Sequence, residues 1–392
     1  MILSHKIELD TTHKQREYFA RCCGTARFVW NRALSMWSEH YEAGDNPSGM
    51  SLMRVFNQDK YELYPWLKGV HRDCHSQPFA NLQKAFVAFF NKTSKRPTFK
   101  KKGKCRDSFY VANDKFRVEG ESVVLPKIGR VRLTESLRFT GKIMSAVVSR
   151  TADRWFISIQ VDIGEYSNPR VGDGVVGVDL GLKTAVTLST GEQIHSPRPL
   201  KAQKARLRRA QRKVSRRVKG SKNRAKATKA VARIHAKIAN IRNDWLHKAT
   251  TRLVRENQTV VVEDLAVQNM QKNRRLSPSI CDMGWFEFRR QLSYKSGIYR
   301  TNIVVADRWY PSSKTCSSCG WIDKSLTMKD RTYECDSCGL SLDRDVNAAI
   351  NLRTLGLSGI ACGSFDNPNG RNSSGAERVE AGTKPCPLVG TH

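Results

Sequence analysis

The sequence predicts a multidomain α/β protein. Its 392 residues exceed the usual length of one domain, about 100–200 residues, so we expect two or three domains. Helical apolar spacing dominates residues 13–94, short alternating strands follow to residue 165, and apolar strands mix with helical segments beyond. Broadly apolar residues make up 39% of the chain, which is enough to bury ordinary cores and excludes a disordered basic tail.

The first half is predicted to be a small β-barrel or sheet interrupted by a helical insertion. Lys6–Asp10 alternates as a half-buried strand, Thr11 and Thr12 are candidate N-caps, and we expect Gly24 to divide the following helical pattern into two helices. A turn-rich stretch, Gly164–Gly174, is the expected linker to the second half. The other expected strands are Ser108–Ala112, Phe116–Val118, Val123–Leu125, Val131–Leu133, Met144–Arg150 and Trp155–Val161.

Positive charge is concentrated in one segment of the second half. The chain carries 68 Lys and Arg against 36 Asp and Glu, a net charge of +32. Lys201–Asn243 holds 17 of these basic residues and no acidic one, and its thin apolar stripe breaks near Gly220. A solvated helix face is the ordinary explanation of a charge run, but this one has nothing acidic to offset it. We therefore expect a basic helical hairpin that binds nucleic acid.

Several basic side chains are candidates for this contact. They are Arg206, Arg208, Arg209, Arg212, Lys213, Arg216, Arg217 and Lys219 in the hairpin, Arg27, Lys100, Lys101 and Lys102 in the first half, and Arg274 and Arg275.

Four of the 11 cysteines form a spaced pair of Cys-x-x-Cys motifs. Cys316 and Cys319 precede Cys335 and Cys338 by a 15-residue spacer, and a glycine follows each pair. Four thiolates complete a closed tetrahedral Zn²⁺ site, so we expect a structural zinc rather than a redox motif. The other seven cysteines are expected to be small buried or free thiols.

Three carboxylates occupy suggestive positions. Asp179 and Glu263 follow apolar strands, and Asp345 lies in the first turn of a predicted helix. Each has an ordinary alternative: a turn residue for Asp179, a solvated strand end for Glu263, and helix capping for Asp345, which capping explains less well than Asp343. Since strand side chains alternate, only one of Glu263 and Asp264 can join a given site. Together the three would suit a two-metal phosphodiesterase holding Mg²⁺ or Mn²⁺.

The ordered motifs resemble the TnpB (OrfB) family of insertion-sequence-encoded proteins, relatives of compact type V CRISPR effector nucleases. GVDLG, VVEDL, CSSCG, CDSCG and LDRDVNAAINL occur in the family's order, and GTARFVWNRAL and KNRRLSPSICDMGWFEFRRQLSYK resemble two further family blocks. The resemblance spans roughly residues 1–353. It implies an RNase H-like (RuvC) nuclease domain with an inserted zinc ribbon, and an N-terminal β-barrel wedge domain interrupted by a helical recognition domain.

The resemblance also implies domain limits and a function. The limits are 1–12 and 95–165 for the wedge, 13–94 for the recognition insertion, 171–310 and 341–354 for the nuclease domain with its hairpin at 201–256, and 311–340 for the zinc ribbon. Residues 355–392 lie outside the resemblance, and their composition, rich in Gly, Asn, Ser and Pro without periodicity, predicts a disordered tail. The implied function is an Mg²⁺-dependent, RNA-guided endonuclease that cuts double-stranded DNA beside a short transposon-adjacent motif. Asp179, Glu263 and Asp345 would be its metal-binding triad.

The expected partners are a guide RNA from the element end and double-stranded target DNA, with a single copy of the protein in the ribonucleoprotein. Two rivals stay open: an RNA-guided DNA binder or repressor that does not cut, and a non-guided transposase or accessory factor. No apolar run approaches the ~18 residues of a membrane span, so we expect a cytoplasmic protein that associates with the nucleoid.

Overall fold

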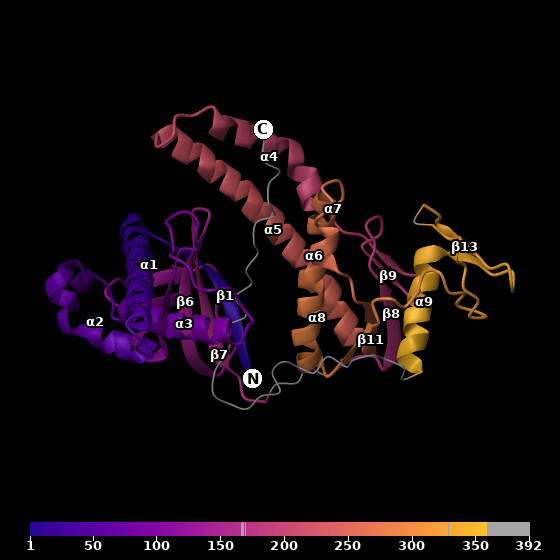
Figure 1. The fold of residues 1–392 in the computed structure, drawn as a ribbon, viewed down its shortest axis with the longest axis horizontal. Helices are drawn as coiled ribbons and strands as arrows, with labels where there is room; N and C mark the ends of the chain where they lie inside the picture. Colours follow the sequence, from indigo (N-terminus) through magenta and orange to yellow (C-terminus); the bar gives the residue numbers. More distant parts are fainter. Residues whose placement is uncertain (166–167, 169, 328, 359–392) are drawn as a thin grey trace. The chain divides into compact units, whose positions relative to one another are not determined.

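The computed structural model describes residues 1–165, 168, 170–327 and 329–358 (Figure 1). The chain forms two compact units, Met1–Glu165 and Tyr166–His392, and the boundary between them falls inside the expected linker. Within the described residues, no helix is both long enough and apolar enough to cross a membrane.

The first unit is a seven-stranded antiparallel sheet with helices inserted after its first strand. The sheet order is β2-β6-β7-β1-β5-β4-β3, so the first strand pairs centrally with β7 and β5. The strands are β1 (Ile2–Asp10), β2 (Ser108–Ala112), β3 (Arg117–Glu119), β4 (Ser122–Leu125), β5 (Gly129–Leu133), β6 (Lys142–Thr151) and β7 (Arg154–Asp162). The helices are α1 (His13–Glu42), α2 (Gly49–Leu63), η1 (Pro65–Gly69), α3 (Asp73–Phe90) and the short η2 (Asn113–Lys115).

The predicted break at Gly24 is wrong, because α1 is one helix of 30 residues. Thr12 caps it in a capping box with Gln15, as the sequence indicated. The first half of α1 packs Phe19 into the core of the sheet, while its second half packs Trp37 against α2 and α3. Packing on both sides of Gly24 outweighs the roughly 1 kcal/mol by which glycine disfavours a helix.

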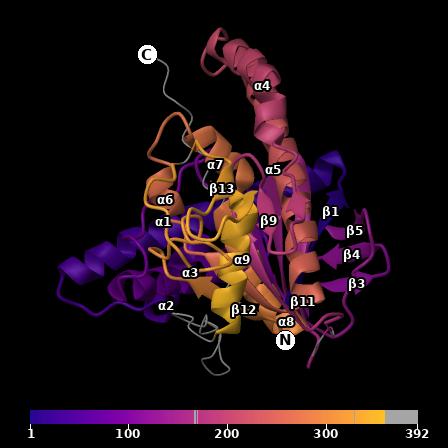
Figure 2. The ribbon, with the colours of Figure 1, turned by 90° about the vertical axis from the view of Figure 1, so that its right-hand side faces the viewer.

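The second unit is built on a mixed five-stranded sheet of order β10-β9-β8-β11-β12 (Figure 2). Strands β8, β11 and β12 are parallel, whereas β9 and β10 extend the sheet antiparallel. Their bounds are β8 (Gly174–Asp179), β9 (Val186–Leu188), β10 (Gln193–Ile194), β11 (Asn257–Glu263) and β12 (Asn302–Ala306). The remaining elements are α4 (Pro199–Ser215), α5 (Lys222–Glu256), α6 (Val267–Met270), α7 (Ser277–Met283), α8 (Trp285–Tyr299), β13 (Thr332–Glu334), β14 (Ser341–Asp343) and α9 (Arg344–Leu357).

Helices cover both faces of this sheet, and residue parity assigns the faces. Val176, Val178, Val260 and Val262 pack in one core with residues of α5 and α8. Val261 packs on the opposite face with Leu352 of α9. Since alternate residues of a strand face opposite ways, the odd-numbered positions of β8 and β11 lie on the α9 side.

The basic segment forms the expected hairpin of α4 and α5, which extends away from the sheet (Figure 1). Leu207, Ile234 and Ile238 make its small core. The predicted tail begins too early, since α9 continues to Leu357. Its remaining residues, 359–392, lie outside the described part of the chain.

Candidate functional site

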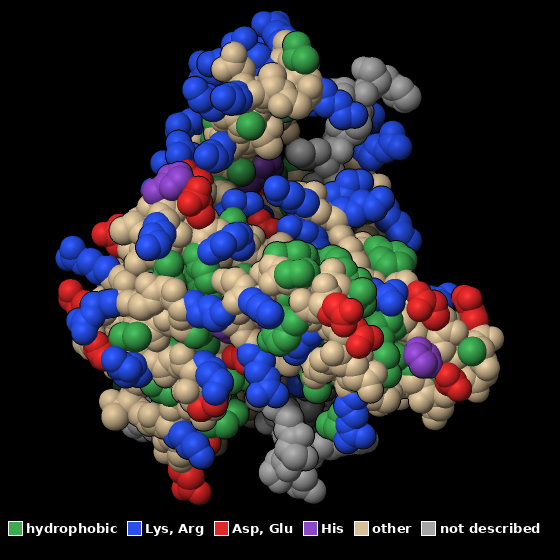
Figure 3. Space-filling model, turned by 90° about the vertical axis from the view of Figure 1, so that its left-hand side faces the viewer, with side chains coloured by type: hydrophobic (Ala, Val, Ile, Leu, Met, Phe, Trp, Pro, Cys, Tyr) green, Lys and Arg blue, Asp and Glu red, His purple; other side chains and the backbone are tan. Residues whose placement is uncertain are grey.

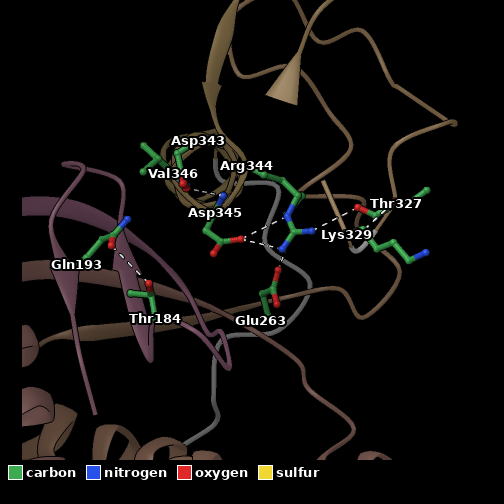
Figure 4. A network of polar contacts seen from close by, with 10 residues as sticks. Thr184, Gln193, Glu263, Thr327, Lys329, Asp343, Arg344, Asp345 and Val346 are labelled. Atoms are coloured by element: carbon green, nitrogen blue, oxygen red, sulfur yellow. Dashed lines mark hydrogen bonds and ion pairs between the residues drawn. The ribbon is translucent and has the colours of Figure 1, made fainter. Parts of the chain in front are cut away.

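The structure brings Asp179, Glu263 and Asp345 together on the α9 side of the sheet. Asp179 ends β8 and Glu263 ends the neighbouring parallel strand β11, so both lie at the same edge. Asp345 lies in the first turn of α9, where Asp343 is the N-cap and accepts hydrogen bonds from the amides of Asp345 and Val346 (Figure 4). Capping therefore accounts for the side chain of Asp343 and not for that of Asp345.

The three carboxylates repel one another. Burial raises the pKa of Asp179 well above its ordinary value, and the charges of Glu263 and Asp345 raise it further. Burial also raises the pKa of Glu263; Asp345 adds to this shift, while a hydrogen bond from Ser312 opposes it. A cation would remove this repulsion, and carboxylate oxygens are the ligands that Mg²⁺ and Mn²⁺ prefer. The three side chains therefore supply the ligand type that such an ion prefers, although among the described residues their oxygens are not a group that lies within 4.8 Å of one another.

One cationic side chain already borders the site. Nη2 of Arg344 lies 2.9 Å from Oδ1 of Asp345, and both side chains are mostly buried, 14% and 16% exposed. Figure 4 shows the guanidinium of Arg344 between the carboxylates of Asp345 and Glu263. In this arrangement Arg344 offsets part of the negative charge.

Two glycines permit the close approach that places these groups. A Cβ built on Gly177 in β8 would lie 1.9 Å from the carbonyl oxygen of Ala349 in α9. A Cβ on Gly181, just beyond β8, would lie 2.6 Å from the carbonyl oxygen of Thr184 and 4.0 Å from Oδ2 of Asp345. Helix α9 can therefore lie directly on β8 only because Gly177 has no side chain.

The predicted alternation of Glu263 and Asp264 is confirmed. Glu263 accepts a hydrogen bond of 2.7 Å from Ser312, whereas Asp264 forms ion pairs with Arg289 and Arg308. Although burial alone would raise it, the two arginines lower the pKa of Asp264 below its ordinary value. Asp264 is thus held as a charged partner beside a cavity of about 350 Å³ that Glu263 also lines.

Sequence reasoning missed a set of polar residues that join α9 to the zinc knuckle. Asn347 donates to the carbonyl of Thr315 (2.7 Å) and accepts from the amide of Ser317 (2.9 Å). Asn351 donates to the carbonyls of Thr315 (2.6 Å) and Ser312 (2.8 Å). Because Ser312 also holds Glu263, these bonds link the knuckle to two of the three carboxylates. Two asparagines in an otherwise apolar helix face were the available signal.

The four predicted zinc cysteines converge. Their sulfur atoms lie within 4.8 Å of one another, with separations of 3.6 Å for Cys316–Cys338 and for Cys319–Cys335. Tetrahedral Zn–S bonds of about 2.3 Å give sulfur separations near 3.8 Å, so the cluster fits zinc. The glycine after each pair, Gly320 and Gly339, has a positive φ of 80° and 70° and closes the knuckle by donating to the first cysteine's carbonyl.

Most of the candidate nucleic-acid-binding residues are exposed, but two of them pack against other side chains. The eight in the hairpin are exposed, as are Lys101, Lys102, Arg274 and Arg275. Figure 3 shows Lys and Arg side chains covering the hairpin at the top of the view. Arg27 differs from these residues, because it pairs with Asp107 at 2.9 Å and both side chains are only 15% exposed. Lys100 packs over the ring of Trp30, its Nζ 3.7 Å from the centroid.

Comparison with known families gives three matches along the chain. Residues 158–274 match the OrfB_IS605 family, described as a probable transposase. Residues 285–352 match a Cas12f1-like TNB domain, and residues 1–46 match a helix-turn-helix domain of the same OrfB group.

Individual proteins are similar over nearly the whole chain. A protein of Streptomyces pristinaespiralis named "Putative RNA-guided DNA endonuclease" is 39% identical, over 97% of this chain and 95% of its own length. The InsQ protein of Escherichia coli K12, which carries the same description, is 34% identical over 92% and 94%. The Cas12f1 chain in a complex with sgRNA and target DNA superposes with a TM-score of 0.55 at 15% identity, over 87% of this chain and 83% of that one, which shows a shared α/β fold. The chain belongs to the TnpB (OrfB) family of insertion-sequence-encoded proteins.

Proposed function

We propose that this protein is an RNA-guided DNA endonuclease that cuts double-stranded DNA beside a short transposon-adjacent motif. The names of its relatives support the guided cleavage, and the observation that carries the chemistry is the three carboxylates converging at one edge of the second unit's sheet. We assign this unit as an RNase H-like nuclease domain with an inserted zinc ribbon. The first unit corresponds to a wedge domain with a helical recognition insertion.

Asp179, Glu263 and Asp345 would hold a pair of Mg²⁺ or Mn²⁺ ions. When bound, these ions supply an activated water and charge stabilisation at the leaving oxygen of a phosphodiester. The side chains themselves have separate tasks. Ser312 holds the Glu263 carboxylate in one orientation, and the α9 N-terminus fixes Asp345. Raised pKa values of Asp179 and Glu263 mean that both bind protons more readily than ordinary carboxyls until a cation arrives.

The bordering arginine has a second task in this proposal. Arg344 pairs with Asp345 in the structure, and if metal ions took over the charge of Asp345, the guanidinium would be available to contact a phosphate. A guanidinium binds phosphate with two parallel hydrogen bonds, so it suits this contact. The exposed hairpin residues would hold the guide RNA and the heteroduplex through their backbones, while base pairing selects the sequence.

The test compares two neighbouring carboxylates: Glu263, which belongs to the proposed triad, and Asp264, which does not. The protein is purified with RNA transcribed from its own element end and is incubated with a plasmid library of randomised flanks and Mg²⁺. Wild type should cut next to one short motif. Glu263→Gln should bind the target without cutting it, whereas Asp264→Asn should still cut, since its carboxylate pairs with arginines outside the triad.

Other outcomes would contradict the proposal. Motif-dependent binding of wild type without cleavage would make the protein a guided repressor. Absence of co-purifying RNA would favour a non-guided transposase or accessory factor. Equal cleavage by Glu263→Gln and wild type would remove the triad from the chemistry.

A further inference from the structure

A second group of metal-binding side chains lies inside the first unit, outside the nuclease chemistry. Cys22 of α1, His71 of the η1–α3 connection and Cys74 of α3 place their ligand atoms within 4.8 Å of one another. All three are buried, with 0%, 4% and 1% of their surfaces exposed. His71 and Cys74 are three residues apart, but Cys22 precedes His71 by 49 residues, so the sequence alone does not show that the three lie together.

The hydrogen bonds of His71 fix which nitrogen faces the group. Nε2 lies 3.0 Å from the carbonyl oxygen of Tyr110, and a carbonyl only accepts, so Nε2 carries the proton. Nδ1 faces the sulfur atoms of Cys22 and Cys74, and in a ring that binds a metal it would be the unprotonated nitrogen that acts as the ligand. Metal-bound histidines characteristically donate their other N–H to a backbone carbonyl or carboxylate, which is the arrangement here.

A fourth donor completes the set. Oη of Tyr18 lies 3.4 Å from Nδ1 of His71 and donates its proton to the carbonyl of Pro126 at 3.1 Å, so its lone pairs are available. The two cysteine sulfurs lie 3.5 Å (Cys74) and 3.9 Å (Cys22) from the same nitrogen. A tetrahedral zinc site has edges of about 3.6 Å between sulfur and nitrogen and about 3.4 Å between nitrogen and oxygen. The three separations are close to these values.

We propose that Cys22, His71, Cys74 and Tyr18 bind a second zinc ion, which joins α1 to the η1–α3 connection and the start of α3. Two thiolates balance the charge of one Zn²⁺, so the filled site is neutral, as burial in an apolar core requires. In the structure, Sγ of Cys74 lies 3.7 Å from Nε2 of His71, nearly as close as it lies to Nδ1. Zinc binding would require this sulfur to move toward Nδ1.

Zinc content of the full-length protein tests the proposal. Wild type purified in zinc-supplemented medium should contain two zinc ions per chain. Cys74→Ser should contain one. The matched control is Cys23→Ser, which alters a cysteine that is equally buried at 3% exposure and adjacent to Cys22 but outside the cluster, and it should keep two.

A second measurement keeps the test decisive if Cys74→Ser does not fold. Stripped wild type is titrated with Co²⁺, whose tetrahedral thiolate complexes give characteristic visible bands. Two equivalents should give thiolate bands, with two distinct spectra, one for four sulfurs and one for two; cobalt bound by carboxylates gives no such bands. A single equivalent, or one zinc per chain in wild type, would show that the cluster is held by hydrogen bonds alone and would overturn the proposal.

Discussion

Replacing Asp179 with Asn should abolish cleavage and yet stabilise the metal-free protein. Asn has nearly the same shape but carries no charge, so it removes one of three carboxylates that repel each other and whose burial disfavours ionisation. Relief of such functional strain contributes about 1–2 kcal/mol. For a unit of this size, 1 kcal/mol corresponds to about 2–4 °C, so the melting temperature should rise by about 2–8 °C at neutral pH.

The pH dependence has a defined sign. The pKa of Asp179 is raised in the folded state, so the folded protein binds more protons than the unfolded chain once the pH exceeds the ordinary value of 3.8. Stability of the metal-free wild type therefore falls as the pH rises through this window. The advantage of Asp179→Asn should grow with pH and vanish in acid, below about pH 4.

Magnesium should reverse the order. A ligand that binds only the folded state at 100 times its Kd adds about 2.7 kcal/mol, and wild type should gain this while Asp179→Asn should not. Melting is followed by circular dichroism with and without added Mg²⁺, and without a chelator, because a chelator would also remove zinc. Asp244→Asn, an exposed carboxylate of α5, is the charge-matched control. A metal-free Asp179→Asn less stable than wild type, or one that cuts within about 100-fold of it, would refute the reasoning.

Three further predictions concern packing, nucleic acid and pH. Gly177→Ala should lower the free energy of unfolding, measured by urea titration, by about 1–3 kcal/mol, because the added Cβ would meet the backbone of Ala349. The control Gly297→Ala, on α8 with open space around it, should raise that free energy by up to about 1 kcal/mol. Equal effects of the two substitutions would contradict the close contact between β8 and α9. Four exposed hairpin residues, Arg208, Arg209, Arg212 and Lys213, are replaced together with Gln. The slope of log affinity for guide RNA against log salt concentration, measured by fluorescence anisotropy, should become shallower by about 0.7 for each phosphate that is no longer neutralised. An unchanged slope would exclude the hairpin as the RNA-binding surface. Burial lowers the pKa of Lys295 to about 8, below its ordinary 10.5, so the unfolded chain binds more protons than the folded protein between these pH values. As the pH rises from about 8 to 10.5, the free energy of unfolding of wild type should therefore increase by about 3 kcal/mol relative to that of Lys295→Met.

Features with a local signal could be predicted from the sequence. Each Cys-x-x-Cys-Gly knuckle is a short motif, and the carboxylates at Asp179 and Glu263 follow apolar strands whose ends meet when the strands are parallel. Alternation along a strand also separated Glu263 from Asp264 correctly.

Features decided by tertiary packing could not be predicted. Gly24 is a legitimate helix breaker, but the two cores on either side of it keep α1 continuous. The ion pair of Arg27 with Asp107, a residue 80 positions away, could not be seen from the sequence either. Ser312 and the Cys22–His71–Cys74 cluster depend on segments that only the fold brings together.

The asparagine bonds between α9 and the zinc knuckle make the ribbon part of the nuclease's construction. Asn347 and Asn351 fasten the helix that carries Asp345 to the loop from Ser312 to Ser317, and Ser312 aligns Glu263. Zinc held by the four cysteines would therefore help to align the carboxylates of Asp345 and Glu263. A shortened variant that lacks the zinc ribbon should therefore lose the alignment of Asp345 and Glu263, even though it retains all three carboxylates.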